Sequence, residues 1–318
     1  MLRILAITTP IYLCIALGYL CVRRSWFTKD DMRVLGKFVL LVALPALLFS
    51  ALATRPLREV FHPAYLLAYL GGALAVIGLV LAYTRLVLRK PLTESAYIAM
   101  GMSCSNSGYV GYPVMLLCFG PLAGLVLAMN VLVENLVKLP LLLATADLGD
   151  PAHREHHLSH ALRQTLARLV RQPMIVAILA GLPVSALGLP IPDVLLRTIG
   201  LFATATSGLA LFIIGGNLVG LSLSGLRSQV AGVALGKLVL HPMMVLGAIT
   251  LTPLLGLPVL TGELRQAAVL SAAMPMLGIY SLLAQRHGHQ GFTAAALLVS
   301  TALSFVTLST ALWLLGLG

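Results

Sequence analysis

The chain has 318 residues, of which 59% are hydrophobic and only 10% charged, and its mean hydropathy is +0.99. A soluble domain cannot bury that much apolar surface, so the composition indicates a polytopic integral membrane protein. The net charge of +11 does not indicate nucleic-acid binding, because the basic residues form short clusters between apolar runs, as in cytoplasmic membrane loops. The four cysteines have no metal-ligand spacing and indicate no disulfide framework.

A transmembrane helix needs about 20 predominantly apolar residues, and ten such segments follow one another along the chain. They lie at residues 4–22, 34–54, 63–88, 94–118, 122–146, 173–189, 195–221, 230–252, 263–285 and 292–316. The first is too long for a secretory signal and has no small-residue cleavage site, so we expect it to remain as a helix. The sequence therefore predicts an all-α protein with ten transmembrane helices.

The basic residues predict the orientation. With the N-terminus outside, 14 of the 21 Lys and Arg residues fall inside, five fall outside, and Lys138 and Lys237 lie within spans. By the positive-inside rule this bias predicts a multi-pass protein of the inner (plasma) membrane, with both termini outside.

The fourth segment carries an unusual number of polar and helix-breaking residues at its middle. They are Ser103, Ser105, Asn106, Ser107, Gly108, Gly111 and Pro113. Lipid offers no hydrogen-bond partner, so an opened backbone at this depth must be covered by protein or water, and such breaks mark binding sites in transporters. An ordinary kinked helix is the alternative. We expect Asn106 to be the main substrate contact, because an amide offers both donors and an acceptor.

A second break is predicted in the ninth segment, around Pro275, which lies mid-span. The loop at 147–172 separates five segments from five, and an odd number of spans gives the two halves opposite orientations, as in inverted-repeat transporters. Pro275 follows Pro113 by 162 residues, and Leu209 follows Pro45 by 164, so one register relates the halves. The predicted repeats are 1–147 and 173–318, joined by 148–172.

The connecting loop itself has two features. Leu158, Leu162, Leu166 and Leu169 stand at helical spacing among arginines, which predicts a basic amphipathic helix on the inner leaflet. Histidines in 153–160 include i, i+4 pairs that could bind a metal, but a solvated loop is favoured and no metal or other cofactor is predicted.

Six motifs together identify a family. They are LVALPALLFSALA at Leu41–Ala53, NSGYVGYP at Asn106–Pro113, LALFIIGGNL at Leu209–Leu218, GKLVLHP at Gly236–Pro242, AAMPMLGIYSLLAQRHG at Ala272–Gly288 and VSTALS at Val299–Ser304. With these motifs the chain resembles the auxin efflux carrier family of the bile-acid and arsenite transporter superfamily. The resemblance implies two inverted five-helix repeats whose broken helices 4 and 9 cross at the midplane. It also implies a panel of helices 1, 2, 6 and 7 against which helices 3–5 and 8–10 move as an elevator, and organic-anion substrates such as auxin, malate or malonate.

One departure from the family bears on specificity. Many members resemble MPxxVN in the ninth helix, whereas this chain has Gly278 and Ile279 where the valine and asparagine would fall. The phrase MPMLGIYSLLAQ is more similar to the bacterial malonate-carrier branch, which favours a small dicarboxylate over auxin. The resemblance places the substrate around both breaks. The residues expected there are Asn106, Ser103, Ser105, Gly108, Tyr109, Pro113, Met274, Pro275 and Tyr280, although Ser103 and Ser105 could bond helix carbonyls and Tyr280 could serve packing.

The intramembrane charges form a second set of candidates. Glu134 and Lys138 stand at i, i+4 on one helix face, and Lys237 is the third charge. A charge at this depth costs about 2.5–3.5 kcal/mol on insertion scales and should have a partner or a task. Lys237 is expected to supply a positive field for an anion or to stabilise exposed carbonyls. Glu134, Lys138 and His241 are candidates for ion or proton coupling, and His241 could instead bond a carbonyl freed by Pro242.

The sequence thus predicts a secondary active transporter of small carboxylates or dicarboxylates and not an enzyme, since no HExxH, GxSxG or paired intramembrane carboxylates occur. An auxin-like aromatic monocarboxylate exporter, a sodium-coupled organic anion symporter and a receptor on the same fold stay open. So do the direction of transport and coupling to protons or sodium. The expected partners are a small organic anion and the lipid bilayer, and a homodimer also stays open.

Overall fold

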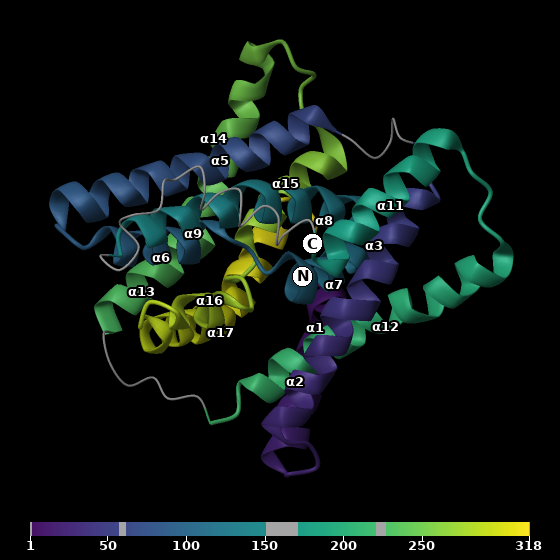
Figure 1. Ribbon diagram of the computed structural model, residues 1–318, viewed down its shortest axis with the longest axis horizontal. Helices are drawn as coiled ribbons and strands as arrows, with labels where there is room; N and C mark the ends of the chain where they lie inside the picture. The colour runs from purple at the N-terminus through teal and green to yellow at the C-terminus, as the bar shows by residue number, and fades with distance from the viewer. Residues whose placement is uncertain (1, 57–61, 151–170, 221–226, 318) are drawn as a thin grey trace.

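The computed structural model describes residues 2–56, 62–150, 171–220 and 227–317. Within these ranges the chain is helical, apart from one isolated two-residue bridge and the connecting turns. The helices, labelled in Figure 1 where there is room, are α1 (Leu2–Arg23), α2 (Lys29–Phe38), α3 (Leu44–Ala53), α5 (Pro63–Ala82), α6 (Leu92–Ser103), α7 (Tyr112–Phe119), α8 (Leu122–Val133), α9 (Leu139–Leu148), α11 (Pro173–Leu187), α12 (Asp193–Asn217), α13 (Arg227–Leu235), α14 (His241–Leu251), α15 (Gly262–Ala273), α16 (Tyr280–Gln285) and α17 (Gln290–Leu314).

Helical residues lie at every segment predicted from the sequence, and the largest difference is that the second begins at Lys29 rather than at 34. Among the described residues, 6 helices are long and apolar enough to cross a membrane, and Thr9–Arg23, Ser107–Phe119 and Pro173–Leu187 are shorter apolar helices. The chain is therefore a multi-pass membrane protein. The predicted amphipathic helix and histidine run fall within 151–170, outside the described residues.

Four prolines within the spans follow wide helical turns, whereas Pro10 and Pro183 lie inside regular α-helices. Four π-helical turns each end two residues before a proline: Val39–Ala43 before Pro45, Ser107–Gly111 before Pro113, Glu134–Lys138 before Pro140 and Gly236–Leu240 before Pro242. A proline has no N–H, and its ring collides with the carbonyl four residues earlier in a regular helix. The wider turn relieves this collision, so the helix continues with the proline in its next first turn. Two of these turns also contain the three intramembrane charges.

The helices form two packing groups (Figure 1). In the first, α1 packs along α12, and α3 packs against both α11 and α12. In the second, α5 packs along α14, α6 against α9, and α13 and α16 against α17. The groups meet where α8 contacts α3 and where α7 contacts α1.

Glycines allow the closest approach within the first group. A Cβ built on Gly215 of α12 would collide with the Ile15 carbonyl of α1, and one on Gly18 would collide with the Phe212 carbonyl. Small residues let helix backbones approach in membranes, where van der Waals packing drives association.

We therefore expect Gly215→Ala to lower the melting temperature of the detergent-purified protein, because overpacking a tight contact costs about 1–3 kcal/mol. Gly208→Ala is the matched control on the same helix, since nothing lies within 4 Å of a Cβ at that position. It should leave the melting temperature unchanged or raise it, as alanine has the higher helix propensity. Equal melting temperatures for both variants would contradict the close contact.

Candidate functional site

Two helix breaks cross at the centre of the second packing group. The first lies between α6 and the turn Ser107–Gly111, and the second lies between α15 and α16. The two breaks pair as a short antiparallel bridge between Ser105 and Met276. The Asn106 N–H donates to the Pro275 carbonyl at 2.8 Å, and the Leu277 N–H donates to the Cys104 carbonyl at 3.2 Å. Each break thus supplies hydrogen-bond partners that lipid cannot.

The break in the fourth span lies at the start of the predicted stretch, at Cys104–Asn106, whereas Pro113 lies inside the helical stretch Ser107–Phe119. The expectation that Pro113 opens the helix was wrong, because the π-helical turn before Pro113 accommodates the proline. The predicted equivalence of Pro113 with Pro275 does not describe the crossing, where residue 105 pairs with residue 276.

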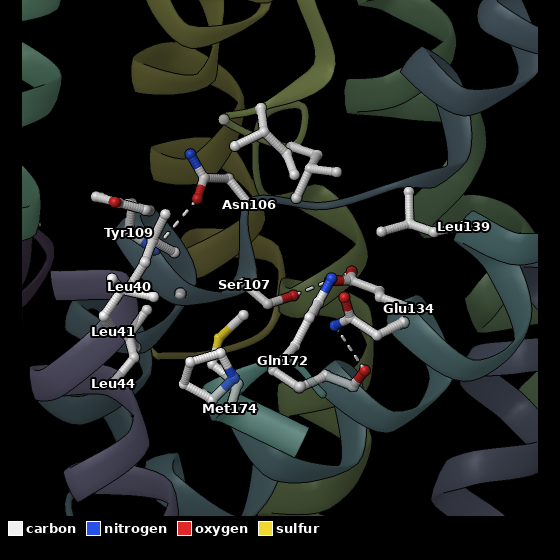
Figure 2. A pocket seen from close by; sticks show the side chains of 17 residues that line it. Leu40, Leu41, Leu44, Asn106, Ser107, Tyr109, Glu134, Leu139, Gln172 and Met174 are labelled. Carbon is white, nitrogen blue, oxygen red and sulfur yellow. Dashed lines mark hydrogen bonds between the residues drawn. The ribbon is translucent and has the colours of Figure 1, made fainter. Parts of the chain in front are cut away.

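Asn106 caps the second half of the broken helix. Its Oδ1 accepts from the Tyr109 N–H at 3.1 Å, and its own carbonyl accepts from Val110 and Gly111. Because Oδ1 faces the Tyr109 N–H, the amide nitrogen points away from Tyr109 (Figure 2). This nitrogen makes no hydrogen bond with any described residue. A Cβ on Gly278 would lie 3.5 Å from that nitrogen, so glycine leaves space beside it. Asn106 therefore presents two N–H donors to the adjoining cavity.

A cavity of about 220 Å³ adjoins this amide, between the two packing groups. Its walls are largely apolar and come from both groups (Figure 2). The lining residues are Leu40, Leu41, Leu44, Asn106, Ser107, Gly108, Tyr109, Val131, Glu134, Asn135, Leu139, Gln172, Pro173, Met174, Leu277, Gly278 and Ile279.

A second cavity, of about 510 Å³, shares six lining residues with the first: Leu40, Leu41, Asn106, Tyr109, Gly278 and Ile279. It extends along α2 and is lined there by Arg33 and Lys37, the cationic residues of this cavity within the described chain. Both are exposed, and Arg33 pairs with Asp30 at 3.1 Å. Because they share these six lining residues, the two cavities adjoin at the Asn106 amide. The part of the second cavity that is lined by Arg33 and Lys37 is its basic mouth.

Glu134 lies at the wall of the first cavity and is 4% exposed. Its Oε1 accepts from the Tyr69 hydroxyl at 2.9 Å, the Ser107 hydroxyl at 3.1 Å and the Ser105 N–H at 3.2 Å. The carboxylate thus lies at the N-terminal end of the helix Ser107–Phe119, where the helix dipole favours negative charge. Lys138 Nζ is 3.6 Å from the same oxygen and 4.8 Å from the Tyr69 ring centroid, and it makes no hydrogen bond with a described residue.

Lys237 lies on the other side of the crossing, fully buried, and it is not among the residues that line the two cavities. Its Nζ is 2.6 Å from the Ala272 carbonyl, 2.9 Å from Ser105 Oγ and 3.0 Å from His241 Nδ1. The Ala272 carbonyl belongs to the last turn of α15. The geometry therefore places the Lys237 ammonium on a helix carbonyl at the break.

The remaining predicted residues are distributed as follows. Gly108 and Tyr109 line the cavities, and the Tyr109 hydroxyl donates to the Gly36 carbonyl at 3.0 Å across the two groups. Ser103 donates to the Ala99 carbonyl at 2.7 Å, and Tyr280 donates to the Tyr97 carbonyl at 2.6 Å, both fully buried. Met274 and Pro275 support the crossing through buried packing and the backbone bridge, respectively.

Sequence reasoning missed much of the cavity wall. Leu40, Leu41, Leu44, Gln172 and Met174 line it from the first packing group. No local sequence pattern separates the leucines and Met174 from apolar residues that face lipid. They line the cavity only because the two packing groups approach each other there. Asn135 could have been recognised, since it is a polar residue beside Glu134 at membrane depth. Among the described residues, no group of three His, Cys, Asp or Glu side chains could hold a metal ion.

Comparison with known proteins identifies the family of the chain. Residues 4–314 match the family described as "Membrane transport protein". The "Putative malonate transporter" of Rhizobium meliloti (strain 1021) is 27% identical over 322 residues, which cover 100% of this chain and 98% of that protein. The "Uncharacterized transporter YfdV" of Escherichia coli (strain K12) is 27% identical over 312 residues, which cover 96% of this chain and 95% of that protein. The chain therefore belongs to the membrane transport protein family, as its motifs indicated.

Proposed function

We propose that the protein is a secondary carrier of small organic acid anions, a carboxylate or dicarboxylate such as malonate or malate. The observation that carries the proposal is the Asn106 amide nitrogen, which has no hydrogen-bond partner among the described residues and faces a cavity between two packing groups. Its N–H groups suit a carboxylate, and a hydrogen bond to a charged group contributes about 1.5–3 kcal/mol.

The helix beside Asn106 supports anion binding as well. The helix starts at Ser107, so the N–H groups of Ser107 and Gly108 precede its first intrahelical bonds, and both residues line the cavity. A helix N-terminus favours negative charge through its free N–H groups and its dipole. Glu134 already occupies the opposite side of this terminus, so the ligand carboxylate approaches from the Asn106 side.

A dicarboxylate fits the two connected cavities. One carboxylate would contact Asn106, and the second would face Lys37 and Arg33 in the wider mouth. The relative from Rhizobium meliloti is named for malonate, the smallest dicarboxylate with a carbon between its two carboxylates, and supports this substrate class.

The apolar wall favours a second candidate, a monocarboxylate with an apolar body. Leu40, Leu44 and Ile279 would contact such a body, and Ile279 stands where many family members have an asparagine. A panel of mono- and dicarboxylates, tested for thermal stabilisation of the purified protein, separates the two candidates.

Alternating access by an elevator motion accounts for the position of the cavity. Asn106, Ser107 and Glu134 come from the second packing group, whereas Leu40, Leu41, Leu44, Gln172 and Met174 close the cavity from the first. Sliding of one group against the other would carry the Asn106 amide past a fixed apolar barrier. Binding at a helix break between two bodies is the usual arrangement in secondary transporters.

Asn106→Asp tests the carboxylate site. Aspartate keeps the oxygen that accepts from the Tyr109 N–H, but it replaces the two donors with negative charge. We expect at least a roughly tenfold loss of carboxylate affinity, since a charged hydrogen bond is lost and a like charge is added. Thermal-shift titration measures the affinity, and the ligand-free melting temperature should stay near the wild-type value. Unchanged affinity for every carboxylate tested would place the site elsewhere.

Lys37→Gln tests the dicarboxylate. It should weaken binding of malonate several-fold more than binding of propionate, because only the doubly charged ligand has a carboxylate near the mouth. Lys29→Gln, on the same helix but outside both cavities, is the control for net charge. Equal losses for the two ligands, or equal effects of both substitutions, would favour the monocarboxylate. The measurement belongs at low salt, since screening weakens exposed charges.

The elevator motion is tested by cross-linking in a cysteine-free background. A Cβ on Gly124 of α8 lies 2.5 Å from Ala51 Cβ of α3, across the two groups. A disulfide formed in the double variant Ala51→Cys, Gly124→Cys, after separation of the helices by about 1 Å, should stop counterflow into proteoliposomes. The control is the double variant Gly71→Cys, Ala248→Cys, because a Cβ on Gly71 lies 3.8 Å from the Cβ of Ala248 within the second group. Its disulfide should leave transport intact. Full transport with the first disulfide formed would exclude the motion.

A further inference from the structure

We propose that the Lys237 ammonium is a built-in cation of the helix crossing, which occupies the position of a coupling cation and makes transport independent of sodium. The inference concerns the ion coupling of the proposed carrier, and its uptake measurements rest on that proposed function. The structural starting point is the set of three short contacts around a fully buried Nζ.

The contacts match the donors of a protonated lysine. An ammonium has three N–H groups and no acceptor. The three neighbours are the Ala272 carbonyl, Ser105 Oγ and His241 Nδ1, each of which can accept. With Nδ1 accepting, the His241 proton lies on Nε2, a tautomer assigned from this network. All three ammonium donors are therefore used at the crossing.

The Lys237 ammonium lies at the C-terminal end of a broken helix, where positive charge is favoured. The last carbonyls of a helix lack intrahelical partners and form the negative end of its dipole. Ala272 is in the last turn of α15, and its carbonyl is bonded by Lys237 at 2.6 Å. In transporters with broken helices, unwound carbonyls and half-helix C-terminal ends are the groups that coordinate sodium. Here a covalently held cation is bonded to such a carbonyl, together with a hydroxyl from the opposite break.

Two lysine ammonium groups already share one buried carboxylate around the crossing. Glu134 is linked to the Lys237 ammonium through Ser105, whose N–H bonds the carboxylate while its hydroxyl accepts from Lys237. Lys138 lies 3.6 Å from Glu134, and no other acidic side chain is buried among the described residues. A mobile sodium ion at this position would add a third positive charge beside one carboxylate, which Coulomb repulsion at low dielectric opposes.

The test uses the full-length protein in detergent and in proteoliposomes. For wild type, we expect the same melting temperature in sodium chloride and in choline chloride, and the same uptake with and without a sodium gradient. Stabilisation or driven uptake by sodium would overturn the proposal. A melting temperature raised by sodium would overturn this proposal but would leave the proposed carboxylate site at Asn106 unaffected. If no transport is detected at all, the comparison of melting temperatures decides.

Two matched substitutions of Lys237 sharpen the test. Lys237→Ala removes the ammonium and leaves a polar space, so its melting temperature should fall in choline chloride and rise in sodium chloride, to a plateau as the vacated site fills. Lys237→Met also removes the charge but fills the space, so it should be destabilised without recovery in sodium. A Lys237→Ala protein as stable as wild type in choline, or one with no more sodium response than Lys237→Met, would overturn the proposal. If neither variant can be purified, the wild-type comparison still decides.

Discussion

Two backbone hydrogen bonds, between Asn106 and Pro275 and between Leu277 and Cys104, hold the polar centre of this protein together. Each span is interrupted at a depth where water cannot satisfy its backbone, and each interruption satisfies part of the other. Asn106, Ser105 and Gly278 owe their positions to this pairing, because they stand on or beside the bridged residues. The candidate site therefore depends on both halves of the chain, because each break supplies hydrogen bonds to the other.

The charges around the crossing follow from the directions of the broken helices. Glu134 lies at a helix start and Lys237 at a helix end, the placements that the helix dipole favours. Their tight hydrogen bonding distinguishes both from Lys37, which is exposed in the cavity mouth and available to a ligand. The buried charges therefore stabilise the crossing, whereas the exposed Lys37 is the charge that an anionic substrate of the proposed kind would meet first.

Most of the fold could be predicted from the sequence, because a membrane span leaves a long apolar run with polar ends. The helix positions were confirmed, and Asn106 was selected as a candidate because its amide offers donors and an acceptor at a polar stretch of the span. The expectation that Pro113 opens the helix was wrong, since this proline is accommodated by a π-helical turn that no sequence pattern distinguishes from a kink. The apolar wall at Leu40, Leu44 and Met174 depends on how two packing groups meet, which local periodicity does not encode.

The chemistry of the cavity is asymmetric, and this asymmetry bears on the substrate. From the first break, Asn106 contributes an amide and Ser107 begins a helix, whereas the second break contributes Gly278 and Ile279. Glycine leaves room beside the Asn106 nitrogen, and isoleucine adds an apolar surface without a donor. For the proposed carboxylate substrate, the cavity therefore offers hydrogen-bond donors at one end only, from Asn106. If the substrate is a dicarboxylate, its second carboxylate would have to reach toward Lys37 and Arg33, and the distance from the amide to these residues would set its preferred length.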